Sequence, residues 1–247
     1  MKEQRNKEQG NIIAGRNSVH EAIAGGRDME KIIFQKNAGG GIKDILAMAR
    51  ERKIPVRYEK KENLDKLYSG NHQGVVAFVA AYKYSSVEEI LNQSDTPFII
   101  ILDNIEDPHN LGAILRSCDG AGADGVIIPK DRAVGLTSTV AKVSAGAIEH
   151  VKVARVTNIA KTVEDLKSRG VWVTACDMDG EKYTAGDLTG PIAIVIGNEG
   201  KGISRLVREK CDFSVSIPMK GKITSLNASN AAAILMYEIV RQRDNIS

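Results

Sequence analysis

The sequence predicts an α/β protein in two parts, a small N-terminal α/β domain and a larger domain built on a parallel β-sheet. From residue 98 onward, short apolar segments alternate with helical ones, which is typical of a buried parallel sheet. Residues 11–81 show a separate alternation of helix and strand signals, and the polar segment 82–97 lies between the two parts. A chain of 247 residues is long enough for two such domains.

The N-terminal part begins with residues 1–10, which are charged and polar and are expected to form a tail. A helix is expected from Asn17, as its capping residue, to Gly25. Further elements are expected as strands at 31–35, 55–58 and 75–80 and as a helix whose apolar face carries Ile42, Ile45, Leu46 and Ala49. Together these elements predict a small domain at residues 11–81.

The segment 82–97 is predicted to be a linker that contains one short helix. Ser86 and Glu89 have the spacing of a capping box, in which each side chain accepts a hydrogen bond from the other residue's backbone. Ser94 to Pro97 then interrupt the helical pattern. The larger domain is therefore placed at residues 98–247.

The larger domain is predicted to carry six strands, at 98–102, 125–128, 151–153, 171–175, 192–196 and 213–217. Gly120 to Gly125 match the pattern G-x-G-x-x-G, which in dinucleotide-binding proteins follows a strand and opens a helix. Here the order is reversed, because a helix at 111–119 precedes the glycines and a strand follows them. These glycines are therefore expected to end the helix.

The composition excludes several classes of protein. The longest apolar run, Val75 to Tyr82, is far shorter than the ~20 residues of a membrane helix. The first ten residues lack the apolar stretch of a secretory signal, so we expect a cytoplasmic protein with no membrane partner. The three cysteines and four histidines are scattered, so neither a disulfide framework nor a metal site is expected.

Positive charge is concentrated near the N-terminus. Residues 1–80 carry 15 Lys and Arg against 10 Asp and Glu, whereas residues 81–247 carry 19 against 21. This asymmetry suggests that the first third meets a polyanion such as a nucleic acid. A solvated lysine-rich surface is the alternative interpretation.

Polar segments follow three of the predicted strands. The first contains Asn110 and Arg116, the second contains Glu199 among three glycines, and the third contains Ser225 and Asn227. Each segment alone is compatible with an ordinary capped helix or a flexible loop. Because all three follow the carboxyl ends of strands, we expect them to meet at the edge where open α/β sheets bind ligands.

The segments DNIEDPHNLGAILR, IGNEGKGIS and IPMKGKITSLNASNAAAI resemble, in this order, the three motifs of the SpoU-type branch of the SPOUT RNA methyltransferases. The likeness covers residues 98–243. Residues 11–80 resemble the substrate-binding domain of the bacterial 23S rRNA guanosine-2′-O-methyltransferases, which is similar to small ribosomal RNA-binding proteins. The resemblance implies a homodimer and a deep trefoil knot in the larger domain, at residues 192–230.

The resemblance also implies the reaction and its residues. A methyl group would pass from S-adenosyl-L-methionine to the ribose 2′-hydroxyl of a guanosine in large-subunit rRNA. The catalytic residues would be Asn110, Arg116, Glu199, Ser225 and Asn227, and the cofactor would lie against Thr174, Gly197, Asn198, Gly202, Ile217, Met219 and Leu226. No metal ion is implied.

Such a reaction is difficult because a ribose hydroxyl is scarcely ionised at neutral pH. The site must remove or share its proton and stabilise the alkoxide that develops, in line with the methyl group. A guanidinium has a pKa above ~12 and keeps its proton. We therefore expect Arg116 to act electrostatically, on a phosphate or on the developing oxyanion.

Two alternatives remain. A tRNA ribose methyltransferase is disfavoured by the N-terminal domain, which the tRNA enzymes of the family typically lack. A non-catalytic RNA-binding protein on the same scaffold is disfavoured because Asn110, Arg116, Glu199 and Asn227 occur together.

Overall fold

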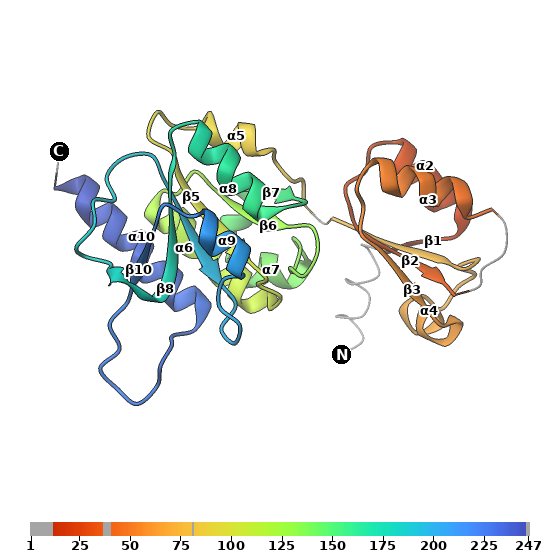
Figure 1. Ribbon diagram of the computed structural model, residues 1–247. Helices are drawn as coiled ribbons and strands as arrows, with labels where there is room; N and C mark the ends of the chain where they lie inside the picture. Colours follow the sequence, from red (N-terminus) through yellow and green to blue (C-terminus); the bar gives the residue numbers. More distant parts are fainter. Residues whose placement is uncertain (1–11, 37–40, 81, 246–247) are drawn as a thin grey trace. The chain divides into compact units, whose positions relative to one another are not determined.

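The computed structural model describes residues 12–36, 41–80 and 82–245 (Figure 1). The expected tail at 1–10 lies outside these residues. The chain divides into two compact units, one of Met1–Lys83 with Gly135–Ser138, the other of Tyr84–Val134 with Thr139–Ser247. Each unit has a β-sheet and a hydrophobic core of its own.

The first unit is built on a mixed sheet with the strand order β1-β4-β2-β3. Its strands are β1 (Ile12–Ala14), β2 (Met29–Gln35), β3 (Val56–Glu59) and β4 (Val75–Val79). β2 runs parallel to β3 and antiparallel to β4, and β1 pairs antiparallel with β4. The three predicted strands are confirmed, whereas the three-residue β1 is too short to give a pattern of its own.

Helices cover both faces of this sheet. α2 (Arg16–Ala24) and α3 (Lys43–Glu51) bury Val19 and Ile45 against one face. α4 (Lys61–Leu67) buries Leu64 against the other. The expected cap at Asn17 is wrong, because α2 begins earlier, after Gly15 at φ 94°. Glycine adopts this left-handed conformation without the steric cost that a side chain would add.

The second unit is built on a parallel sheet with the strand order β10-β8-β9-β5-β6-β7. Its strands are β5 (Phe98–Asp103), β6 (Gly125–Pro129), β7 (Lys152–Val156), β8 (Trp172–Lys182), β9 (Ile192–Gly197) and β10 (Phe213–Ser216). All six predicted strands are confirmed. β8 continues seven residues beyond the predicted end at 175. The prediction stopped early because the second half of the strand is polar and carries no apolar pattern.

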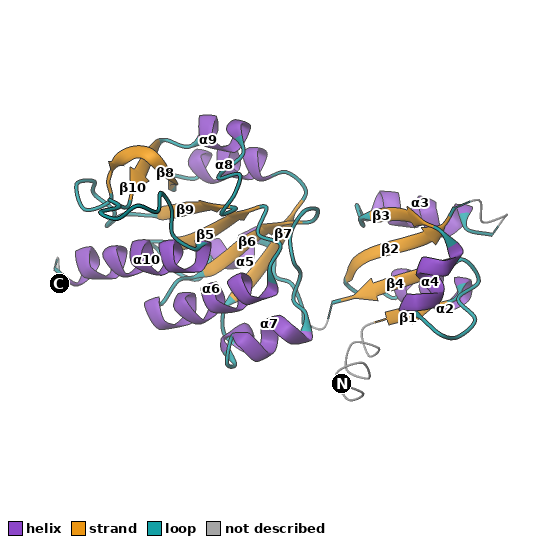
Figure 2. Cartoon of the chain, turned by 90° about the horizontal axis from the view of Figure 1, so that it is seen from below, coloured by secondary structure: helices purple, strands orange, loops and turns teal. Residues whose placement is uncertain are grey.

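Helices also cover both faces of the second sheet, as Figure 2 shows for α8 and α9 on one side and α6 and α10 on the other. The helices are α5 (Val87–Leu91), α6 (Pro108–Ala121), α7 (Ser138–Val143), α8 (Ile159–Ser168), α9 (Arg205–Lys210) and α10 (Ala228–Asp244), with a 3-10 turn at Ala147–Glu149. α6 and α10 pack together, and Cys118 Sγ lies 3.7 Å from Met236 Sδ.

The predicted linker is mostly part of the second unit. The capping box is confirmed, because Glu89 N–H donates to Ser86 Oγ and Ser86 N–H donates to the Glu89 carboxylate. Ile90 of this helix is fully buried in the core beside Val163. The boundary therefore falls near residue 83, and 84–97 pack on the second unit rather than linking the two.

The glycines at 120–125 end a helix, as predicted. Gly122 caps α6 in the left-handed conformation at φ 66°, and β6 begins at Gly125. The trefoil knot at 192–230 stays a prediction.

Candidate active site

The site begins where two neighbouring parallel strands end. In the register of β5 and β9, Asp103 lies opposite Gly197, so the loops that follow both strands leave the sheet together. The buried Asp103 carboxylate accepts hydrogen bonds from Ser204 N–H at 2.6 Å and from the Asn104 side chain at 2.8 Å. This carboxylate therefore joins the loop after β5 to the end of the loop after β9.

The loop after β9 is a tight, closed turn. The backbones of Asn198 and Gly202 exchange hydrogen bonds of 3.2 and 2.7 Å, and the Asn198 side chain accepts from Gly200 N–H while donating to Asn104 O. A Cβ at Gly197 would lie 2.3 Å from the carbonyl carbon of Gly202, and Gly202 has φ 66°. A side chain at Gly197 would therefore force the backbone to move, and the positive φ of Gly202 is one that glycine adopts without strain.

Glu199 stands on this loop and connects all three motifs. Its Oε1 accepts hydrogen bonds from the Asn110 side chain at 2.9 Å, from the Asn227 side chain and from Ala228 N–H at 3.2 Å. Hydrogen bonds to an ionised acceptor are roughly twice as strong as those between neutral groups. The other oxygen, Oε2, makes no hydrogen bond to the described part of the chain, and the side chain is exposed.

The two asparagines hold Glu199 from two helix N-termini. Asn110 lies in the first turn of α6, whose N-cap Asp107 accepts from His109 N–H at 2.8 Å. Asn227 is the N-cap of α10 and accepts from Ser229 N–H. Asn227 also donates to Asn110 Oδ1 at 2.8 Å, so the three side chains form one network. The positive ends of both helix dipoles lie near the carboxylate and favour its charge.

A cavity of about 480 Å³ opens beside Glu199. Its walls come from the end of β9 and its loop, from the second half of β8 and from the segment that leads into α10. The cavity combines apolar side chains such as Ile217 and Leu226 with the carboxylates of Asp177 and Asp179. Arg208 forms ion pairs with both carboxylates, with its Nη1 3.3 Å from Asp177 Oδ2 and its Nη2 3.5 Å from Asp179 Oδ2.

Most of the residues named from the sequence gather at this cavity. The lining includes Gly197, Asn198, Glu199, Gly202, Ile217, Met219, Ser225 and Leu226. Asn110 and Asn227 are not part of the lining, but both donate hydrogen bonds to Glu199, which is. Hydrogen bonds thus join Asn110 to Glu199 and to Asn227, which lie 89 and 117 positions later in the sequence.

Thr174 does not reach the cavity. It is fully buried in β8, and its hydroxyl lies 3.5 Å from Phe213 O on the neighbouring strand. The part of β8 that lines the cavity follows it, at Cys176 to Asp179. Burial, and then the charge of Asp177, raises the pKa of Cys176 to about 11, so this thiol stays protonated. The sequence pattern ended this strand at 175 and therefore missed these residues.

Arg116 also lies outside the cavity lining. It is six positions after Asn110 on α6, and at 3.6 residues per turn the two side chains point about 120° apart. The side chain is exposed and makes no hydrogen bond or ion pair within residues 12–36, 41–80 and 82–245. A single copy of the chain therefore leaves Arg116 away from Glu199.

The described residues hold neither a candidate metal site nor a membrane-spanning helix. No group of three or more His, Cys, Asp or Glu side chains there could hold a metal ion. No helix among them is both long and apolar enough to cross a membrane.

Comparisons with known proteins identify the family of the chain. Residues 97–237 match the model of the SpoU rRNA Methylase family, and residues 12–85 match that of the RNA 2′-O ribose methyltransferase substrate-binding domain. YacO of Bacillus subtilis, named as a TrmH-family tRNA/rRNA methyltransferase, is 47% identical over 245 residues, covering 97% of this chain and 98% of its own. A Staphylococcus haemolyticus protein named for the same family is 49% identical over 243 residues, covering 95% and 97%.

A solved structure is also similar. The SpoU methyltransferase AviRb from Streptomyces viridochromogenes, crystallised with AdoMet, has a TM-score of 0.62 and 26% identity, covering 95% of this chain and 90% of its own. The family model spans more than half of this chain, and the relatives match it almost end to end. The chain therefore belongs to the SpoU family of RNA 2′-O-ribose methyltransferases.

Proposed function

We propose that this enzyme transfers a methyl group from S-adenosylmethionine to the ribose 2′-hydroxyl of a guanosine in large-subunit rRNA, in the cytoplasm. The observation that carries the proposal is the convergence of Asn110, Glu199 and Asn227 beside a cavity at the carboxyl ends of β5 and β9. The substrate-binding domain at residues 12–85 supports RNA as the acceptor.

The cavity suits S-adenosylmethionine by size and by chemistry. At about 480 Å³ it lies within the range of roughly 300–1,000 Å³ that is usual for small-molecule sites. Ile217 and Leu226 offer apolar contact for a flat purine, and the glycine loop offers backbone groups for its polar edge. Asp177 and Asp179 contribute negative charge to the lining, which Arg208 offsets in part through its ion pairs with both carboxylates. When bound, S-adenosylmethionine supplies an electrophilic methyl group on a sulfonium.

The chain's own residues then have to prepare the hydroxyl. Oε1 of Glu199 is occupied by three N–H donors, so the network fixes the carboxylate while Oε2 makes no hydrogen bond to the described residues. In the proposed complex, Oε2 accepts the hydrogen bond of the 2′-hydroxyl and so orients the attacking oxygen. Ser225 lines the same cavity and places a second hydroxyl within it. Preorganised polar groups of this kind commonly contribute about 10²–10³ in turnover.

Arg116 has to act from outside its own cavity. We propose that the enzyme works as a homodimer in which Arg116 of one copy stabilises the oxyanion or binds the phosphate at the cavity of the other. The exposure of Arg116 and its direction on α6 support this arrangement. The guanidinium keeps its proton, so its role is electrostatic.

Methyl transfer to purified RNA tests the function. The enzyme is incubated with methyl-labelled S-adenosylmethionine and either large-subunit rRNA or tRNA from a strain that lacks it, and methylated riboses are then mapped. Label in one guanosine ribose of rRNA is the expected result. Label in tRNA alone would replace the rRNA assignment with the tRNA alternative. Calorimetry that detects no binding of S-adenosylmethionine would favour a non-catalytic RNA-binding protein.

A further inference from the structure

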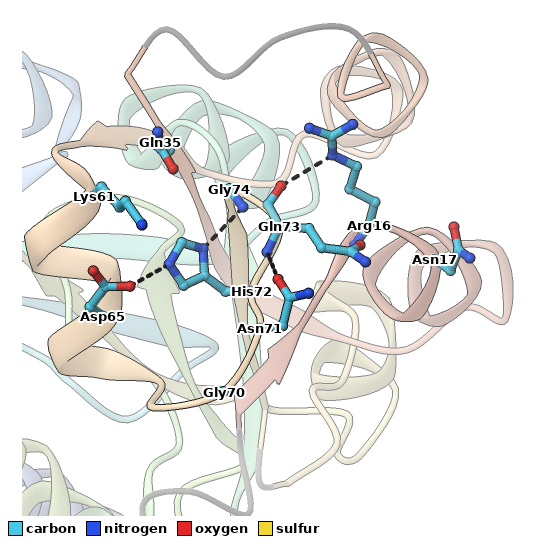
Figure 3. A pocket seen from close by; sticks show the side chains of 10 residues that line it. All are labelled: Arg16, Asn17, Gln35, Lys61, Asp65, Gly70, Asn71, His72, Gln73 and Gly74. Atoms are coloured by element: carbon cyan, nitrogen blue, oxygen red, sulfur yellow. Dashed lines mark hydrogen bonds and ion pairs between the residues drawn. The ribbon is translucent and has the colours of Figure 1, made fainter.

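The first unit contains a cavity of its own, far larger than one side chain. Its volume is about 730 Å³, and it lies between the start of α2, the end of β2, α4 and the loop 70–74 (Figure 3). The residues that carry the argument are the cations Arg16 and Lys61 and the amides Asn17, Gln35, Asn71 and Gln73. The lining holds no aliphatic side chain and no Phe, Tyr or Trp, and its one aromatic ring, His72, is buried, so most of the groups that it offers are polar.

The floor of this cavity is held in a defined shape by His72. The ring is 4% exposed, and its Nδ1 accepts from Gly74 N–H at 3.0 Å. Its Nε2 therefore carries the proton and donates to Asp65 Oδ1 at 2.9 Å. The one carboxylate that lines the cavity is thus bound to His72, as Figure 3 shows, and two cations outnumber it.

Arg16 is held at the cavity by the same loop. Its Nε donates to Gln73 O at 3.1 Å, and its backbone N–H donates to Gln73 Oε1 at 2.9 Å (Figure 3). Gln73 and Gly74 both have positive φ, at 50° and 81°. A strained non-glycine residue persists only where surrounding contacts determine it, and here Asn71, His72 and Arg16 provide them.

We propose that this cavity binds one unpaired nucleotide of the RNA substrate, with its phosphate near Arg16 and Lys61 and its base edge hydrogen-bonded by the amide side chains. The proposal rests on the proposed function and names the RNA-contacting surface of its substrate-binding domain. Amides both donate and accept, so they match the polar edges of bases, and Arg and Lys match phosphate. Because His72, the one aromatic ring in the lining, is buried, we assign recognition to base edges rather than to stacking.

The experiment compares Lys61→Gln with Lys43→Gln in the full chain. Both lysines are exposed and each begins a helix, but Lys43 on α3 does not line the cavity. RNA affinity is measured by filter binding with labelled rRNA over a range of salt concentrations. Lys61→Gln is expected to weaken binding about tenfold and to lower the slope of log Kd against log salt by roughly 0.7–0.9, the loss of one phosphate contact. Lys43→Gln is expected to keep the wild-type slope.

Asn17→Ala tests the base contact separately. It removes an exposed amide at the cavity and no charge, so it is expected to weaken RNA binding while leaving the salt slope unchanged. Both variants are expected to raise the KM for RNA and to leave the KM for S-adenosylmethionine as in wild type. Wild-type RNA affinity in both Lys61→Gln and Asn17→Ala would overturn the proposal.

Two further experiments are needed. One distinguishes RNA from a free nucleotide as the ligand of the cavity, and the other distinguishes failure of the RNA cavity from failure of the proposed function. Guanosine monophosphate is added as a competitor, and displacement of RNA at micromolar concentration would assign the cavity to a free nucleotide instead. Methylation of rRNA by the wild-type enzyme is assayed in parallel. Its absence, with RNA affinity still lost in the Lys61 variant, would remove the proposed function and leave the RNA cavity standing.

Discussion

The side-chain amide of Asn110 donates to Glu199 Oε1 at 2.9 Å, although 89 positions separate the two residues in the sequence. Asn227 closes the network by donating to both. Glu199 stands on the loop after β9, Asn110 in the first turn of α6 and Asn227 at the N-cap of α10. The network therefore couples three segments to one carboxylate, and removal of any member should change the geometry of the cavity.

Glu199→Gln is expected to lower turnover by about 10², because the neutral amide loses the charge that its three donors stabilise. The affinity for S-adenosylmethionine should change little, since Oε2 is assigned to the ribose hydroxyl. Single-turnover methylation and calorimetry measure the two quantities. Glu209→Gln is the matched control, because Glu209 is exposed and forms an ion pair with Arg205 one turn away on the same helix. Equal turnover in both variants would contradict the role of Glu199.

Asn227→Ala is expected to lower stability as well as activity. The substitution removes the N-cap of α10 and leaves Asn110 Oδ1 without its donor. Loss of an N-cap costs about 0.5–2 kcal/mol of the free energy of unfolding. Chemical denaturation of the full chain measures this loss. Asn227→Asp keeps a capping oxygen, so it should recover the capping part of the stability, but it lacks the donor to Asn110 and places a second carboxylate beside Glu199, so the turnover should stay low.

Gly197→Ala is expected to weaken S-adenosylmethionine binding by at least tenfold. The added Cβ would lie 2.3 Å from the carbonyl carbon of Gly202, so the loop that carries Glu199 has to move. Gly190→Ala in the same unit is the control, because no atom lies within 4 Å of its Cβ position. Calorimetry measures the affinity, and circular dichroism checks the fold. Tight binding by the Gly197 variant would show that this loop does not shape the cavity.

The apolar pattern of a strand decides how well its ends can be predicted from the sequence. The strands of the parallel sheet carry buried apolar runs, so most of their ends were predicted within about one residue, whereas β7 ends three residues and β8 seven residues later than predicted. The polar half of β8 has no such pattern, and it supplies Asp177 and Asp179 to the cavity wall. Residues such as Glu199 were found because loops after parallel strands share one edge.

Tertiary contacts decided the features that the sequence did not predict. Thr174 was expected to bind the cofactor, but it lies in the buried first part of β8, where its hydroxyl is covered. The segment 82–97 was expected to link the domains, but Ile90 buries itself in the second core. The cavity around His72 carries no local motif, since its residues come from four separate segments of the first unit.

Cysteine modification should depend steeply on pH. Burial raises the pKa of Cys176 to about 11 and that of Cys211 to about 12, with a nearby aspartate adding to each effect. Burial also raises the pKa of Cys118 above its usual range. The reactive thiolate therefore forms only as the pH rises toward these values. At pH 8, iodoacetamide is expected to leave the activity unchanged over an hour, while labelling at pH 10.5 should appear first at Cys176. Rapid inactivation at pH 8 would contradict the burial of these thiols.

Arg116→Ala is expected to lower turnover by about 10²–10³ and to leave S-adenosylmethionine affinity nearly intact, since Arg116 lies outside the cavity lining. Arg116→Lys should also have a low turnover, because a point charge does not reproduce the planar fork of a guanidinium.

Mixed dimers test whether Arg116 acts on the cavity of the second copy. Arg116→Ala and Glu199→Gln chains are unfolded and refolded together, and turnover is compared with that of each variant alone. If Arg116 acts across the dimer, a dimer of one chain of each kind contains one cavity with both intact groups, so turnover should recover to about a quarter of wild type. If both groups act within one chain, each cavity of such a dimer lacks one of them, and turnover should stay at the level of the single variants.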